Sequence, residues 1–216
     1  MTTLWPEHQG EPVLTVATLF WQANEKGQRF SSMYDESWVE KLYRGFARNL
    51  TVPFRFVCYT DRPRSFIEPI GQRQIKSERP GYADCIQPYE IEGPMILVGL
   101  DTIVCGDCDG LTDYCVDADR IALPRDPYNL AQACNGVALI PPGWTKIGRE
   151  HRGENDMEWV RRFPHAYLDD AFPGQVVSFK GHVEKQGVGD ARIVYFHGER
   201  KPHQLPDHPL VKDHWR

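Results

Sequence analysis

The chain has 216 residues and a net charge of −5, with 25 Lys and Arg against 30 Asp and Glu. This acidic balance argues against a nucleic-acid partner, because nucleic-acid binding depends on clustered Lys and Arg that neutralise phosphates. The sequence has no apolar stretch long enough to span a membrane and no N-terminal pattern typical of a secretory signal, so we expect a cytoplasmic protein.

The N-terminal third of the chain predicts a strand, a helix and a second strand. Residues 12–21 form an apolar, β-rich run that is typical of a buried strand. Residues 37–50 carry apolar side chains at helical spacing, and Ser37 with Glu40 has the pattern of a capping box. Residues 54–59 predict the second strand. This order predicts a βαβ unit and therefore a parallel sheet.

The remaining elements are predicted to be short. They are strands at 72–77, 94–100, 119–123 and 136–140, a helix at 156–163 and a last strand at 192–196. The sequence has no internal repeat and no low-complexity linker. We therefore expect one α/β domain over residues 1–216, with a mixed, mostly parallel sheet flanked by helices and with peripheral tails at 1–11 and 204–216.

A carboxylate follows the central apolar strand. Asp101 comes directly after the run that ends at Leu100, and ligands of parallel sheets bind at the carboxyl ends of the strands. Such a carboxylate can hold Mg²⁺ or Mn²⁺ against a diphosphate, although a simple turn-forming role is the alternative. The literal D-x-D sequence, Asp107 and Asp109, lies farther along in a Gly-flanked turn, where acidic residues mostly form turns and helix caps.

Three cysteines near this strand suggest a second interpretation of the segment, as a zinc site. Cys105, Cys108 and Cys115 have spacing similar to that of a zinc knuckle, but a structural zinc site needs four ligands. The fourth would have to come from Cys134 or from a distant His. A zinc-binding interaction module is therefore the least supported alternative, and we expect these cysteines to be packing and turn residues.

A third group of chemically useful residues follows the last strand. His197 and Gly198 come directly after it, and Lys201 stands three residues beyond the glycine. Glycine lets a ligand approach the backbone closely, histidine can bind a metal, and lysine is a point charge for phosphate. A lone histidine at such a position is more often a satisfied structural residue than a ligand.

Several segments together resemble a known family. VLTVATLFW, YRGFARNLTVPFRFVCYTDRP, ILVGLDTIVCGD, NGVALI and ARIVYFHGERKPH are similar to segments of nucleotide-sugar glycosyltransferases of the GT-A fold. The nearest resemblance is to the retaining transferases of family 8, which include glycogenin and bacterial galactosyltransferases, and in particular to compact bacterial and phage members. It extends from about Val13 to His203.

The resemblance implies a single Rossmann-like GT-A domain and a hexosyltransferase activity. It implies metal-assisted transfer, with retention, of a sugar from a nucleotide-diphosphate donor such as a UDP-sugar. The acceptor would be a carbohydrate, a lipid or a protein, and the sequence does not identify which. The implied cofactor is Mn²⁺ or Mg²⁺.

The resemblance also implies roles for residues of the nucleotide and metal site. Asp101 matches the second Asp of the family's strand-end motif, whereas Gly99 replaces the first. Asp101 and His197 are the implied metal ligands, and Asp101 would also bind the donor. Ala17 and Thr18 fall where the first strand of the family meets the nucleotide.

The remaining implied roles concern binding of the sugar donor and catalysis. Gly198 and Lys201 match the family's C-terminal motif, in which the lysine contacts the diphosphate, so both are implied donor-binding residues and Lys201 is also catalytic. Asp156 matches the Asp of an Asp-Gln pair and would orient the reacting groups, with Met157 in place of the Gln.

The departures from the family pattern favour an alternative function. Gly99, Met157 and Leu19 replace polar or charged residues of the family. The alternative is a sugar-nucleotide-binding protein with a degenerate D-x-D site and little or no transfer activity.

Overall fold

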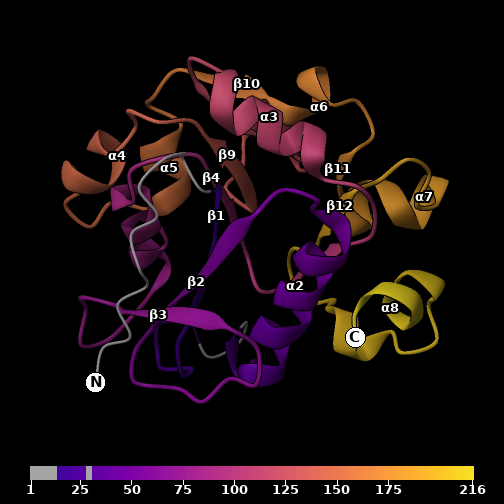
Figure 1. The fold of residues 1–216 in the computed structure, drawn as a ribbon, viewed down its shortest axis with the longest axis horizontal. Helices are drawn as coiled ribbons and strands as arrows, with labels where there is room; N and C mark the ends of the chain where they lie inside the picture. Colours follow the sequence, from indigo (N-terminus) through magenta and orange to yellow (C-terminus); the bar gives the residue numbers. More distant parts are fainter. Residues whose placement is uncertain (1–13, 28–30) are drawn as a thin grey trace.

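The computed structural model describes residues 14–27 and 31–216, and the predicted tail at 1–11 lies outside them. Within these residues the main sheet has seven strands in the order β10-β6-β9-β4-β1-β2-β3 (Figure 1). Its strands are β1 (Leu14–Phe20), β2 (Phe54–Thr60), β3 (Ile70–Gln74), β4 (Met95–Val98), β6 (Ile121–Leu123), β9 (Val137–Ile140) and β10 (His165–Tyr167).

The sheet is mixed and mostly parallel, as predicted. β1 pairs in parallel with both β2 and β4, and the pairs β2–β3 and β6–β10 are also parallel. β9 is inserted antiparallel between β4 and β6. The predicted βαβ unit is confirmed, because α2 (Glu36–Asn49) connects the parallel strands β1 and β2.

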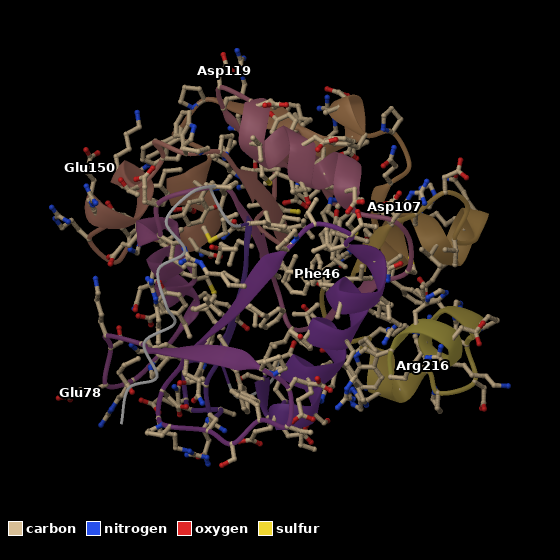
Figure 2. The ribbon with its side chains drawn as sticks, in the orientation of Figure 1. Phe46, Glu78, Asp107, Asp119, Glu150 and Arg216 are labelled. Carbon is tan, nitrogen blue, oxygen red and sulfur yellow. The ribbon has the colours of Figure 1, made fainter. Side chains whose placement is uncertain are left out.

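The central strands of the main sheet are buried on both faces. On β4, Ile96 and Val98 belong to one apolar cluster and Met95 and Leu97 to another on the opposite face. This alternation explains why the strand reads as an unbroken apolar run. Phe46 of α2, labelled near the centre of Figure 2, is fully buried in the first cluster.

Helices cover the two faces. α2 and α3 (Asp109–Asp117) pack on the first face, whereas the 3₁₀ helix η1 (Tyr82–Glu90), α4 (Lys146–Arg149) and α5 (Asp156–Val160) pack on the second (Figure 1). The predicted helix at 156–163 is therefore shorter than expected. None of the helices in the described part of the chain combines the length and apolarity that crossing a membrane would need.

The predicted capping box of α2 is wrong. The helix begins two residues earlier than the pattern indicated, and Asp35 is its N-cap, whose side chain accepts a hydrogen bond from the Ser37 backbone N–H at 3.0 Å. Glu40 is inside the helix and accepts instead from the Ile67 backbone N–H at 2.8 Å and from Arg44 at 3.2 Å. Aspartate and serine can both cap a helix, and the Asp35 carboxylate takes this role here.

A smaller sheet carries the last predicted strand. It contains β11 (Val176–Ser178), β12 (Ile193–Tyr195) and β5 (Thr102–Val104), in which β5 runs antiparallel to β12. The other described elements are the hairpin of β7 (Arg125–Asp126) and β8 (Asn129–Ala133), α6 (Leu168–Ala171), the π-helix η2 (Phe179–Val183), α7 (Glu184–Gln186), the 3₁₀ helix η3 (Pro202–Gln204) and α8 (Pro209–His214).

The C-terminal segment after β12 is attached to α2. The rings of His203 and Trp215 pack against Trp38, with centroids 5.4 Å and 4.8 Å away, and the Lys41 ammonium lies 3.6 Å from the centre of a Trp215 ring. Leu210 of α8 is buried in a third apolar cluster beneath the small sheet. The segment predicted as a peripheral tail therefore contributes to the packed interior.

Candidate functional site

Asp101 lies where the chain passes from the large sheet to the small one. β4 ends at Val98 and β5 begins at Thr102, so Asp101 follows the carboxyl end of a central strand. The backbone is fixed on both sides of this crossing. Gly99 N–H donates to the Gly136 carbonyl at 3.1 Å, and Phe196 N–H donates to the Asp101 carbonyl at 2.9 Å. The carboxylate is thereby held at the sheet edge where ligands of such folds bind.

A cavity of about 490 Å³ opens at this edge, a volume within the usual range for small-ligand sites. Five of the residues singled out in the sequence line it: Asp101, Asp156, His197, Gly198 and Lys201. They come from three separate parts of the chain. The fold thus brings together the residues that the sequence could only name one by one.

The first strand contributes different residues from those predicted. Ala17 and Thr18 are both fully buried and lie outside the cavity lining. The lining from this strand and the loop after it consists of Leu19, Phe20 and Trp21. The cavity lining on this side therefore begins one residue farther along the chain than Thr18.

Lys201 is a buried cation in this cavity. It is only 4% exposed, and its ammonium forms an ion pair with the Asp101 carboxylate. The segment reaches this position through a turn at Gly198, whose φ of 72° is readily adopted only by glycine. Lys201 is then anchored by its backbone N–H, which donates to Gln204 Oε1 at 2.9 Å.

His197 is engaged at both ring nitrogens. Nε2 lies 2.6 Å from Ser178 Oγ, and Nδ1 lies 3.1 Å from the Tyr128 hydroxyl. Burial lowers the pKa of His197, and the nearby ammonium groups of Lys180 and Lys201 lower it further. The imidazole is therefore biased toward its neutral form, and each nitrogen already has a hydrogen-bonding partner.

The candidate metal ligands at this site do not make up a complete metal centre. Gly99 supplies no carboxylate, Asp101 is paired with Lys201, and His197 has both nitrogens occupied. Across residues 14–27 and 31–216, no three His, Cys, Asp or Glu side chains are grouped so that they could hold a metal ion. The residues present do not fit the Mn²⁺ or Mg²⁺ site that the resemblance implies, and the metal stays a prediction.

Asp156 is a buried carboxylate at the first turn of α5. It is 8% exposed, and its Oδ2 accepts a hydrogen bond from Asn135 Nδ2 at 3.3 Å. Asn135 Oδ1, the oxygen of its side-chain amide, in turn accepts from the Tyr89 hydroxyl at 3.0 Å. Burial raises the pKa of Asp156, and the hydrogen bond from Asn135 offsets only part of this effect. A carboxyl group with a raised pKa in a cleft is a candidate for chemistry.

Sequence reasoning missed Asn135 and the aromatic side chains of the cavity. Asn135 stands just before the buried strand β9, and a polar residue at such a boundary is the signal that could have found it. Tyr34 lies near Asp101, and burial together with that carboxylate raises the pKa of its hydroxyl. Tyr82 and Tyr128 also line the cavity and are 44% and 69% exposed, so they form part of its rim.

The acidic pair Asp107 and Asp109 has the structural role that was predicted. Asp107 accepts a hydrogen bond from the Asp109 backbone N–H at 2.9 Å, and Asp109 accepts one from Thr51 N–H at 2.9 Å. Neither residue lines the cavity. This pair forms a turn at the start of α3 and connects it to the end of α2.

The clustered cysteines donate to backbone carbonyls. The thiol of Cys105 donates to Ala191 at 3.2 Å, that of Cys108 to Gly106 at 3.3 Å and that of Cys115 to Met95 at 3.3 Å. Burial raises the pKa of Cys105 to about 11 and those of Cys108 and Cys115 to about 12, so the thiolates that zinc requires are disfavoured.

We therefore expect the double substitution of Cys105 and Cys108 by Ala to leave nucleotide binding unchanged. The free energy of unfolding should fall by about 0.5–3 kcal/mol for each site, as is usual for point changes. Nucleotide titration and urea unfolding measure the two effects, and elemental analysis measures bound zinc. One zinc per chain in the wild type, lost in the variant, would contradict this expectation.

The sequence matches no family model and no curated protein. Among solved structures, the glycosyltransferase GlyE of Streptococcus pneumoniae TIGR4 superposes with a TM-score of 0.58 and 14% identity, covering 89% of this chain and 56% of that one. The bifunctional glycosyltransferase WbbM gives 0.59 and 10%, covering 90% and 47%. This chain thus spans about half the length of these two proteins.

A third structure is matched over most of its own length. It is the galactosyltransferase LgtC in complex with donor and acceptor sugar analogs, with a TM-score of 0.53 and 9% identity, covering 87% of this chain and 88% of LgtC. At these identities the similarity establishes the fold, which is the one that the sequence resemblance implied. The chain has the GT-A fold of nucleotide-sugar glycosyltransferases.

Proposed function

We propose that this protein is a glycosyltransferase that moves a sugar from a nucleoside-diphosphate donor, such as a UDP-sugar, to an acceptor. One observation carries the proposal. Asp101, Asp156, His197, Gly198 and Lys201 come from distant parts of the chain and line a single cavity at the carboxyl edge of a GT-A sheet. Convergence of this kind is typical of a binding site in an open α/β fold.

The chemistry of transfer fits the charges in the cavity. When the bond between the sugar and the diphosphate breaks, the departing diphosphate gains negative charge, and a positive group held nearby lowers the barrier. Lys201 is that group, because no other Lys or Arg is among the described residues that line the cavity. Asp156, which lines the same cavity, would orient the reacting groups. Retention at the transferred carbon is part of the proposal.

The rim of the cavity suits a carbohydrate on the acceptor side. Tyr82, Tyr128 and Met157 line the opening and are 44%, 69% and 37% exposed. Aromatic and apolar side chains can pack against the apolar face of a sugar ring while their polar edges reach its hydroxyls. The acceptor can equally be a sugar carried on a lipid or on a protein.

Nucleotide binding tests the proposal. UDP, GDP, CDP and ADP, and the corresponding nucleotide sugars, should be compared by thermal unfolding. One of them should stabilise the protein, by about 2.7 kcal/mol at a concentration about 100-fold above its Kd. For a chain of this size each kcal/mol raises Tm by about 2–4 °C. The absence of any shift over the whole set would refute the proposal.

A nucleotide-sugar-binding protein without turnover is the second candidate function. The incomplete metal set around Gly99 and the replacement of a family Gln by Met157 favour it. Both candidates predict nucleotide binding, so the discriminating measurement is release of the nucleoside diphosphate from the donor that binds. Slow hydrolysis or transfer supports the enzyme, whereas tight binding with no release over many hours supports the binding protein.

A further inference from the structure

Lys201 occupies the place where a cation would be needed. Its side chain is 5% exposed, and it is paired with Asp101, whose side chain is 17% exposed. An ammonium group has three N–H donors. One of them bonds to the Asp101 carboxylate and two remain for other acceptors. A lysine in this position can bridge a carboxylate and a phosphate, as a divalent ion would do between the same two groups.

The other candidate metal ligands around Asp101 are poorly suited to hold a metal ion. A Cβ atom on Gly99 would stand 2.9 Å from Asp101 Oδ1, so the carboxylate of Asp101 leans over the position where a second carboxylate would begin. This close approach means that positions 99 and 101 face the same space. His197 already bonds to Ser178 and Tyr128.

We propose that this pocket binds a nucleoside diphosphate without a divalent metal, with Lys201 as the cation that bridges Asp101 and the diphosphate. The inference rests on the proposed function, because it assumes that a diphosphate occupies the cavity. It also assigns Gly99 a role: the absence of a carboxylate there leaves Asp101 free to pair with the lysine rather than to form half of a metal site.

The central experiment is calorimetric titration of the wild-type protein with UDP, once in EDTA and once with excess MnCl₂. The two dissociation constants should agree within about threefold, a difference of less than about 0.7 kcal/mol. Binding that requires Mn²⁺ would overturn the inference and leave the proposed function standing. If UDP fails in both buffers, the series is repeated with GDP, CDP and ADP, and failure of all four overturns both.

Two lysine variants locate the cation. Lys201→Ala should weaken UDP binding in EDTA by about tenfold or more, because it removes a charged hydrogen-bond donor. Lys201→Arg should keep part of the affinity, since it restores the cation with a different geometry. The matched control is Lys180→Ala. Lys180 is exposed and outside the cavity lining, and its Nζ lies 3.4 Å from the Tyr128 hydroxyl. Equal losses in Lys180→Ala and Lys201→Ala would overturn the assignment, as would full affinity in Lys201→Ala.

A double variant reverses the arrangement. Gly99→Asp combined with Lys201→Ala supplies the second carboxylate and removes the resident cation. Gly99 lies outside the left-handed region, and its nearest obstacle is the end of a side chain that can rotate, so the backbone accepts the substitution. UDP binding by this variant should depend on Mn²⁺. Circular dichroism confirms folding, and a folded double variant that binds UDP equally in EDTA and in MnCl₂ would overturn the role of Gly99.

Discussion

Replacing Asp101 with Ala should lower the free energy of unfolding by about 3 kcal/mol, because the Lys201 ammonium would remain buried without its counter-ion. The lysine side chain is only 5% exposed, so water can replace little of the lost interaction. The expected cost is at the lower end of the range for broken buried pairs, since Asp101 itself is partly exposed. Urea unfolding of the two proteins at neutral pH measures the difference.

A double-mutant cycle provides the control for this prediction. Lys201→Met alone removes the cation and keeps the apolar stem, and the combination with Asp101→Ala removes both charges. The double variant should be more stable than the sum of the two single effects indicates, by about 1–3 kcal/mol. Additive effects would mean that the two charges do not stabilise each other in the folded protein.

Replacing Asp156 with Asn should raise stability at neutral pH and reduce turnover. Burial raises the pKa of Asp156 in the folded protein above its unfolded value of about 3.9. Between these two pKa values the folded protein holds more protons, so the stability contributed by protonated Asp156 is lost as the pH rises through the folded pKa. Asn cannot ionise and avoids this loss.

The advantage of Asp156→Asn should therefore be present at pH 7 and disappear below the unfolded pKa. Turnover of the donor should fall by about 100-fold, a loss typical of misplacing the reacting groups, whereas KM should change little. Thermal unfolding between acidic and neutral pH measures the first effect, and release of the nucleoside diphosphate measures the second. A variant that is less stable at pH 7, or one that retains full turnover, would contradict the corresponding half of the prediction.

The sequence predicted the parallel part of the fold because the pattern there is local. β1, α2 and β2 each have a distinct periodicity, and the short loop between α2 and β2 leaves few ways to pack them. The antiparallel direction of β9 was not predicted, since an apolar run has the same composition whichever way it enters a sheet. β5 was missed because Thr102–Val104 continues the run of β4 after only three residues.

The sequence predicted those site residues that are chemically useful and also stand next to a recognisable strand end or glycine. Asp101, His197 and Lys201 each follow a recognisable strand or a glycine, and all three line the cavity. What a single sequence cannot reveal is pairing between distant residues. The ion pair of Lys201 with Asp101 joins positions 100 residues apart, and the contacts of Asn135 with Tyr89 and Asp156 depend on packing across the sheet.

The attachment of the C-terminal segment to α2 affects how ligand affinity is set. Lys201 stays in the cavity only while the segment that carries it remains packed on α2, through the contacts of His203 and Trp215 with Trp38. The measured affinity is then the intrinsic affinity multiplied by the fraction of molecules in the docked state. A substitution at the aromatic contact could thus weaken ligand binding without changing any residue that touches the ligand, and a bound ligand would in turn hold the segment in place.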